Sequence, residues 1–155
     1  MWKSLYDGLL QLLTIPWAEY LNENKRQGRL VRDTFFNEIY GWSGLVLLLV
    51  ILISCVLYYF YFNRRFGRYY SLGTYFSWMI ISSLLVGITT FIIARSFAND
   101  FISPTWSLVT WISFINIFYG VIMFFIISIV CQTIAILVRK VLSIDLSPMG
   151  SRTPF

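Results

Sequence analysis

The chain has 155 residues, of which 58% are hydrophobic and 12% are charged, and its net charge is +5. A soluble domain carries about 25% charged residues, so this chain has too few charges to cover a fold in water. Its basic residues lie beside long apolar runs, where bilayer headgroups would be. This placement favours a lipid surface over nucleic acid as their partner.

The residues that usually perform chemistry are scarce. Histidine is absent, which removes the usual metal ligand and the usual general base. Cys55 and Cys131 lie deep inside uncharged runs, so we expect two small buried side chains and no disulfide. No phosphate loop, dinucleotide turn, paired metal-ligand spacing or nucleophile elbow is present. We expect no enzyme activity, no cofactor and no bound metal.

Residues 1–38 form an N-terminal region that differs from the rest. Apolar residues recur there at three- and four-residue spacing, at Trp2, Leu5, Tyr6, Leu9, Leu12 and Leu13. The spacing predicts an amphipathic helix that ends before Pro16 and is followed by a polar linker. Its apolar run is too short to cross a bilayer, so we expect it to lie flat at the interface. Packing against a protein partner is the alternative.

The first predicted transmembrane helix covers residues 40–62. A charge-free stretch from Ile39 to Asn63 contains it, and about 20 apolar residues suffice to cross a bilayer. Tyr40 and Trp42 lie at one end, and several tyrosines lie at the other. Aromatic rings at both ends are typical of a helix that meets both membrane interfaces.

The second predicted transmembrane helix covers residues 72–94 and is richer in small residues. Ser83 and Gly87 are four residues apart, so they lie on one face of the helix. Two small residues at this spacing allow another helix backbone to approach closely. We therefore expect Ser83 and Gly87 to contact a neighbouring helix.

The third charge-free stretch, Phe101–Val138, is too long for one perpendicular crossing and too short for two. We favour a transmembrane helix at residues 115–138, preceded by an interfacial segment at 104–114 that Pro104 would open. A single long, tilted helix from Pro104 onward is equally compatible with the sequence. Residues 141–155 form a C-terminal tail without periodicity.

Small and polar residues of the third helix fall on one side of it, within an arc of about 160°. They are Ser113, Asn116, Gly120, Ser128, Cys131, Gln132 and Ala135. This stripe either lines a pore or packs against other helices through small residues and amide hydrogen bonds. We favour packing, with Asn116, Gly120 and Gln132 as contact residues.

Basic residues flank the predicted helices unevenly. Arg64, Arg65 and Arg68 occupy a very short loop, and Arg139 and Lys140 directly follow the third helix. By the positive-inside tendency, these five residues anchor the topology and face the cytoplasm or an organellar matrix. The three arginines could also bind an anionic lipid headgroup, a role we rank below anchoring.

These features predict an all-α membrane protein with three transmembrane helices and an N-terminal amphipathic interfacial helix. We expect a multi-pass subunit of a bacterial or organellar inner membrane that anchors or scaffolds a larger complex. Its partners would be the lipid bilayer and other membrane subunits or copies of itself, without nucleic acid. The alternative is a self-assembling pore in which several copies turn the polar stripe towards a channel.

Overall fold

Every described element is a helix. The computed structural model describes residues 2–14, 16–23, 25, 27–62, 72–98 and 105–141, with only the backbone at some helix ends. The elements are α1 (Trp2–Leu13), α2 (Trp17–Glu23), α3 (Gly28–Thr34), α4 (Tyr40–Val56), α6 (Leu72–Ala98) and α7 (Thr105–Val141), with π-helical segments η1 (Phe35–Ile39) and η2 (Leu57–Phe62). No residue in these ranges belongs to a strand, which confirms the predicted all-α class.

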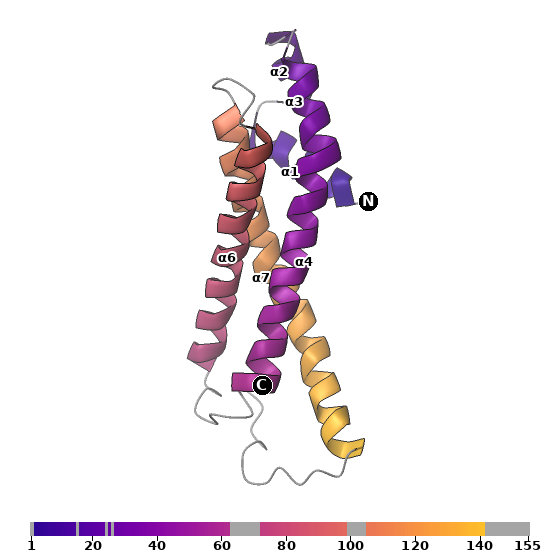
Figure 1. Cartoon of the computed structure of the whole chain (residues 1–155), viewed down its shortest axis with the longest axis vertical. Coiled ribbons are helices and arrows are strands. Elements are labelled where there is room, and N and C mark those ends of the chain that lie inside the picture. The colour runs from indigo at the N-terminus through magenta and orange to yellow at the C-terminus, as the bar shows by residue number, and fades with distance from the viewer. Residues whose placement is uncertain are drawn as a thin grey trace.

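Three helical stretches are long and apolar enough to cross a membrane, as predicted. They are Gly28–Tyr61, Leu72–Ala98 and Ser107–Ile134, with 34, 27 and 28 residues. Each exceeds the roughly 20 residues that a crossing needs. The three lie side by side in alternating directions, and α6 and α7 share the most extensive contact (Figure 1).

The first stretch begins earlier than the sequence predicts. The helix is already formed at Gly28 and continues through α3 and η1 into α4, so it includes twelve residues before Tyr40. No proline interrupts this region, and the backbone N–H of Tyr40 donates to the carbonyl of Phe35 within the π-helical turn. Adjacent Ile39 and Tyr40 are both fully buried just after this turn.

Helix α7 runs without interruption from Thr105 to Val141, a length of 37 residues. Residues 105–114 are therefore continuous with the rest of the helix, which is the single-helix arrangement left open by the sequence. No proline or glycine lies between Thr105 and Tyr119, so nothing breaks the backbone hydrogen-bond ladder. At 1.5 Å per residue the helix is about 55 Å long, well beyond a hydrocarbon core of about 30 Å.

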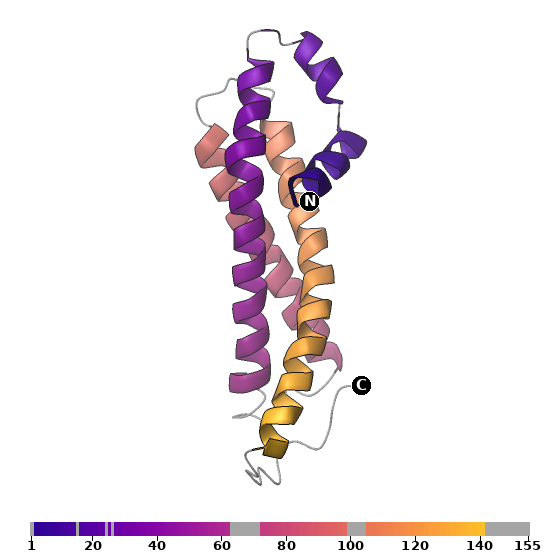
Figure 2. The ribbon, with the colours of Figure 1, turned by 90° about the vertical axis from the view of Figure 1, so that its right-hand side faces the viewer.

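Helices α1 and α2 form an N-terminal cap at one end of the bundle (Figure 2). Pro16 separates them, and its carbonyl accepts hydrogen bonds of 3.0 Å from the backbone N–H groups of Glu19 and Tyr20. Helix α1 contacts α7 and α4 and buries Tyr6 and Leu10 there. The helix predicted from the N-terminal spacing thus packs against the bundle of its own chain.

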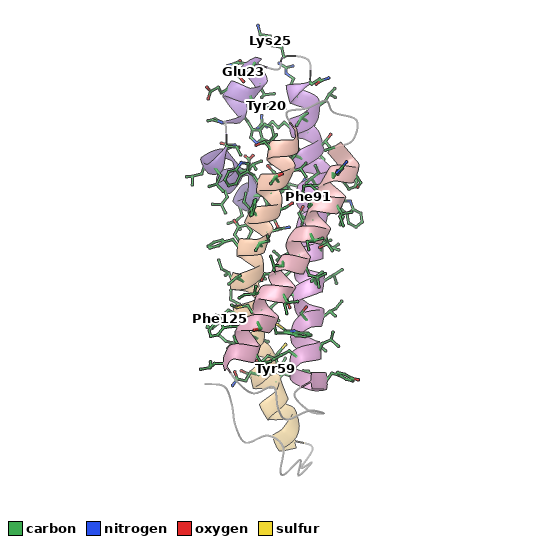
Figure 3. The ribbon with its side chains drawn as sticks, turned by 90° about the vertical axis from the view of Figure 1, so that its left-hand side faces the viewer. Tyr20, Glu23, Lys25, Tyr59, Phe91 and Phe125 are labelled. Carbon is green, nitrogen blue, oxygen red and sulfur yellow. The ribbon has the colours of Figure 1, made fainter. Side chains whose placement is uncertain are left out.

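Buried side chains form two clusters, one at each end of the bundle. Figure 3 places Tyr20 at the cap end and Tyr59 near the opposite end. Large apolar side chains such as Ile88 and Phe118 point outward, with exposed fractions of 60% and 61%, and Phe125 projects from the outer surface in the same view. The interior contains the polar, small and aromatic residues together with aliphatic ones such as Leu47 and Ile51.

Candidate functional site

The side chain of Asn116 on α7 is the centre of a buried polar network. It is fully buried, and its Nδ2 donates to Thr90 Oγ1 on α6 at 2.6 Å. The same nitrogen lies 3.3 Å from the carbonyl oxygen of Ser43 on α4. Its Oδ1 accepts a hydrogen bond from the hydroxyl of Tyr6 on α1. One neutral amide therefore joins four helices.

Two aromatic rings enclose the ring of Tyr6 at one end of this network. The ring of Tyr6 stacks on that of Tyr40, with centroids 5.6 Å apart and planes 17° from parallel. Tyr119 meets the same ring edge-on, also at 5.6 Å. The Tyr119 hydroxyl donates to the backbone carbonyl of Leu5 at 3.3 Å. These contacts fix the position of α1 against α4 and α7.

Burial makes ionisation of the Tyr6 hydroxyl still less favourable than in an exposed tyrosine, which is already neutral at physiological pH. Loss of solvent raises the pKa of its hydroxyl above the ordinary value, and the neighbouring Tyr119 acts in the same direction. The hydrogen bond to Asn116 opposes this rise but is a smaller effect. Tyr6 therefore stays neutral near physiological pH and remains a hydrogen-bond donor.

Asp7 is the carboxylate that joins the two helices of the cap. Its Oδ1 accepts a hydrogen bond of 2.6 Å from Trp17 Nε1, and its Oδ2 accepts one of 2.9 Å from Gln11 Nε2. The Trp17 ring in turn packs edge-on against Phe35, with centroids 6.0 Å apart. The side chains that bond to Asn116 are neutral, and the charges of Asp7 and Arg32 act on the site through the nearby hydroxyl of Tyr40.

Two buried hydroxyls on α4, those of Tyr40 and Ser43, lie beside the network, three residues apart. The Tyr40 hydroxyl is close to the side chains of Asp7 and Trp17, whereas the Ser43 hydroxyl has no hydrogen-bond partner among the described residues. Such a group forgoes a hydrogen bond that water would give it, which costs about 1–3 kcal/mol. The Ser43 hydroxyl could therefore form a hydrogen bond with a further group at this site.

Below the network, small residues bring α6 and α7 into close contact. A Cβ atom added to Gly120 would lie 3.1 Å from Ser83 Oγ and 3.2 Å from Ser83 Cα. A Cβ atom added to Gly87 would collide with the side chain of Ile117. Glycine is thus the residue that fits at both positions.

A second polar cluster lies at the opposite end of the bundle. Ser128 on α7 is within 2.6 Å of the Tyr59 hydroxyl and accepts a hydrogen bond of 3.1 Å from the Tyr75 hydroxyl. Nearby, Trp78 Nε1 donates to the carbonyl of Ser54 at 3.1 Å. These contacts again link α6 and α7 to the first long helix.

Four of the five residues predicted as helix contacts lie between α6 and α7. Ser83 and Gly120 lie against each other, Gly87 lies against α7, and Asn116 is the hydrogen-bonding centre. Gln132 is half-buried on α7. Four of these positions thus come together along the α6–α7 contact.

None of the side chains predicted as topology or lipid anchors is described by the structure. Arg64, Arg65 and Arg68 lie outside the described residues. Arg139 and Lys140 belong to the final turns of α7, and only their backbone is described.

Sequence analysis missed the partners of these residues. Tyr6 was recognised only as part of an apolar face, while Tyr40 and Tyr59 were assigned to the membrane interface, yet all three are buried. Thr90 and Tyr75 were not assigned a role. The sequence indicates such partners in one way only: each hydroxyl within a charge-free helix requires a hydrogen-bond partner inside the protein.

The chemistry available at these sites is limited to neutral hydrogen bonding and ring stacking. Cys55 and Cys131 are buried free thiols. Among the described residues, no group of three or more histidine, cysteine, aspartate or glutamate side chains is placed to hold a metal ion. The arrangement can hold helices together or bind a neutral polar group.

A comparison with protein-family models, curated proteins and solved structures finds no match to this chain.

Proposed function

We propose that the chain is a non-catalytic, multi-pass membrane subunit that anchors or scaffolds a larger membrane-embedded complex. The observation that supports this proposal best is the direction of the polar side chains. Asn116, Thr90 and Ser128 are buried against one another's helices, whereas the large residues that are exposed on the same helices are mostly apolar. Such a distribution suits a bundle whose solvent is lipid.

Two exposed aromatic residues of the first long helix, one within it and one at its end, support a membrane position. Trp42 and Tyr61 are both 47% exposed. They are about 19 residues apart, which corresponds to about 28 Å of helix and matches the hydrocarbon thickness. Trp111 on α7 is also exposed, towards the cap end. We place the two membrane interfaces near these rings.

The cap then lies at one interface. Tyr6 and Leu10 face the bundle, but Leu5 and Leu12 are 45% and 78% exposed. In water such leucines would be unfavourable, whereas at the hydrocarbon boundary they would be buried in lipid. The cap accordingly uses one flank of its apolar face for the bundle and the other for the bilayer.

We orient the short loop with Arg64, Arg65 and Arg68 towards the cytoplasm or matrix, together with Arg139 and Lys140. The positive-inside tendency supports this choice. With three crossings, the cap lies on the other side of a bacterial or organellar inner membrane.

The pore alternative has less support. Ser113, Asn116 and Ser128 of the polar stripe are buried within a single chain. Several copies could turn these residues towards a shared channel only by separating α7 from α4 and α6. No carboxylate or carbonyl array of the kind that replaces an ion's water is found among the described residues of the stripe.

The experiment is to isolate the native particle from its source membrane by mild detergent extraction. Multi-angle scattering would give its protein mass, and mass spectrometry would identify its chains. A particle with other membrane proteins in fixed ratio is expected. A protein mass of 18.2 kDa, that of one chain, after crosslinking in the intact membrane would contradict the proposal.

A further inference from the structure

The ring and hydroxyl of Tyr6 occupy a site built almost entirely by other helices. We call it the Tyr6 site and define it by the side chains of Tyr40, Ser43, Thr90, Asn116 and Tyr119. Tyr40 and Tyr119 contact the ring, and Asn116 Oδ1 accepts a hydrogen bond from the hydroxyl. Tyr6 itself is only 1% exposed. The site therefore surrounds a phenol group almost completely.

The three long helices form this site without help from α1. The hydrogen bond from Asn116 to Thr90 joins α7 to α6, and the contact of Asn116 with the Ser43 carbonyl joins α7 to α4. Neither contact involves the cap. The amide would therefore keep its position if α1 moved away, with Oδ1 left as a free acceptor.

The site offers more hydrogen-bonding groups than Tyr6 uses. Tyr6 engages Asn116, while the Ser43 hydroxyl has no partner within the described part of the chain. A guest with a second polar atom could satisfy groups that a phenol ring does not reach. None of the five side chains that define the site is charged, and the two charges that act on Tyr40, those of Asp7 and Arg32, are of opposite sign, so the guest it suits is neutral.

Helix α1 attaches to the bundle through a small set of side chains. Among its described side chains Tyr6 and Leu10 are buried, and Leu5, Leu12 and Leu13 are exposed. The bond from Tyr119 to the Leu5 carbonyl and the contact of the Lys3 ammonium with the Phe36 ring add to this attachment. A helix of 12 residues is too short to be stable without its packing contacts, so displacement of Tyr6 should weaken the hold of α1 on the bundle.

We propose that the Tyr6 site binds a neutral aromatic compound with a hydroxyl or carbonyl oxygen, and that Tyr6 is an intramolecular competitor for this site. Such a compound would stack on Tyr40, bond to Asn116 and release α1 from the bundle. Ring compounds of this kind partition to the membrane interface, which is where the site lies if the helices cross the bilayer as proposed above. The inference does not depend on assembly with other subunits.

The test uses the full chain in lipid nanodiscs and 4-methylphenol, which reproduces the tyrosine side chain beyond Cα. In Tyr6→Ala the site is vacant, and we expect saturable binding of 4-methylphenol. Toluene has the same ring without the hydroxyl and should bind about tenfold more weakly, because it cannot bond to Asn116. The Tyr6→Phe variant is the matched control, since its ring still fills the site and should prevent saturable binding.

The unmodified protein provides the second measurement. Excess 4-methylphenol should increase amide hydrogen exchange in residues 2–13 several-fold and leave exchange in α6 unchanged. The proposal is overturned if Tyr6→Ala shows no saturable binding, or binds toluene equally well. It is also overturned if exchange in α1 does not respond. Should Tyr6→Ala fail to fold, the response of α1 in the unmodified protein decides alone.

Discussion

The hydroxyl of Tyr6 donates a hydrogen bond to the side-chain oxygen of Asn116, a residue 110 positions farther along the chain. The nitrogen of the same amide bonds to Thr90, so one side chain connects α1, α6 and α7. A hydrogen bond between helices in lipid contributes about 0.6–2 kcal/mol. Asn116 makes two hydrogen bonds with side chains of other helices. Loss of Asn116 should therefore destabilise the packing at the cap end of the bundle.

Replacing Asn116 by leucine tests this connection. The change keeps the number and branching of the heavy atoms but removes the amide that bonds to Tyr6 and Thr90, so we expect a loss of about 1–3 kcal/mol in the free energy of unfolding. Asn37→Leu is the control, since Asn37 is exposed on the same half of the molecule. Thermal unfolding in detergent measures both variants. Equal melting temperatures for the two would show that the amide is dispensable.

Replacement of two glycines by alanine should change the stability of the bundle differently. Gly120→Ala places a Cβ atom 3.1–3.2 Å from Ser83 and should destabilise the bundle by about 1–3 kcal/mol through overpacking. Gly41→Ala meets no atom within 4 Å. Alanine is favoured over glycine in a helix by up to about 1 kcal/mol, so Gly41→Ala should be neutral or stabilising. A stabilising Gly120→Ala would mean that α6 and α7 pack differently.

The cluster at the opposite end can be tested by a double-mutant cycle. Tyr59→Phe and Ser128→Ala each remove one side of the 2.6 Å contact between the two hydroxyls. We expect a coupling energy of about 0.5–1 kcal/mol between the two changes. Ser77→Ala is the control partner, because Ser77 is exposed on α6. A coupling energy of zero for Tyr59 with Ser128 would contradict the contact.

The orientation can be tested with introduced cysteines. The native thiols Cys55 and Cys131 are buried and should react little with an impermeant thiol reagent. In intact cells we expect Gly67→Cys to be protected and Asn22→Cys, on the exposed surface of the cap, to be labelled. Labelling of Gly67→Cys with protection of Asn22→Cys would reverse the proposed topology.

The sequence predicts the three long helices well because hydropathy and the absence of charge depend on local composition alone. Each crossing needs about 20 apolar residues, and the stretches around Leu47, Leu84 and Phe124 meet that requirement independently of one another. Helix ends are predicted less well. Gly28 and Thr105 lie far outside the minimal crossings, because a helix can continue beyond the bilayer wherever nothing breaks it.

The contacts between helices follow only in part from the sequence. Small residues indicate where backbones approach, which is how Ser83 and Gly120 could be selected before their contact was known. Their contact with each other could not be predicted. A helix that is apolar on all sides does not indicate which of its faces turns towards a neighbouring helix. Tyr6 has the same ambiguity. Its ring fits an apolar face, and only the neighbouring Asn116 explains why its hydroxyl is buried.

The most direct test of the account is reconstitution of the purified chain in planar bilayers. Polar residues of α7 such as Asn116 form hydrogen bonds to other helices of the same chain. We therefore expect no single-channel steps from the unmodified protein or from Asn116→Asp. Reproducible steps whose conductance changes in Asn116→Asp would contradict it, because Asn116 would then face a conducting path instead of Thr90 and Tyr6.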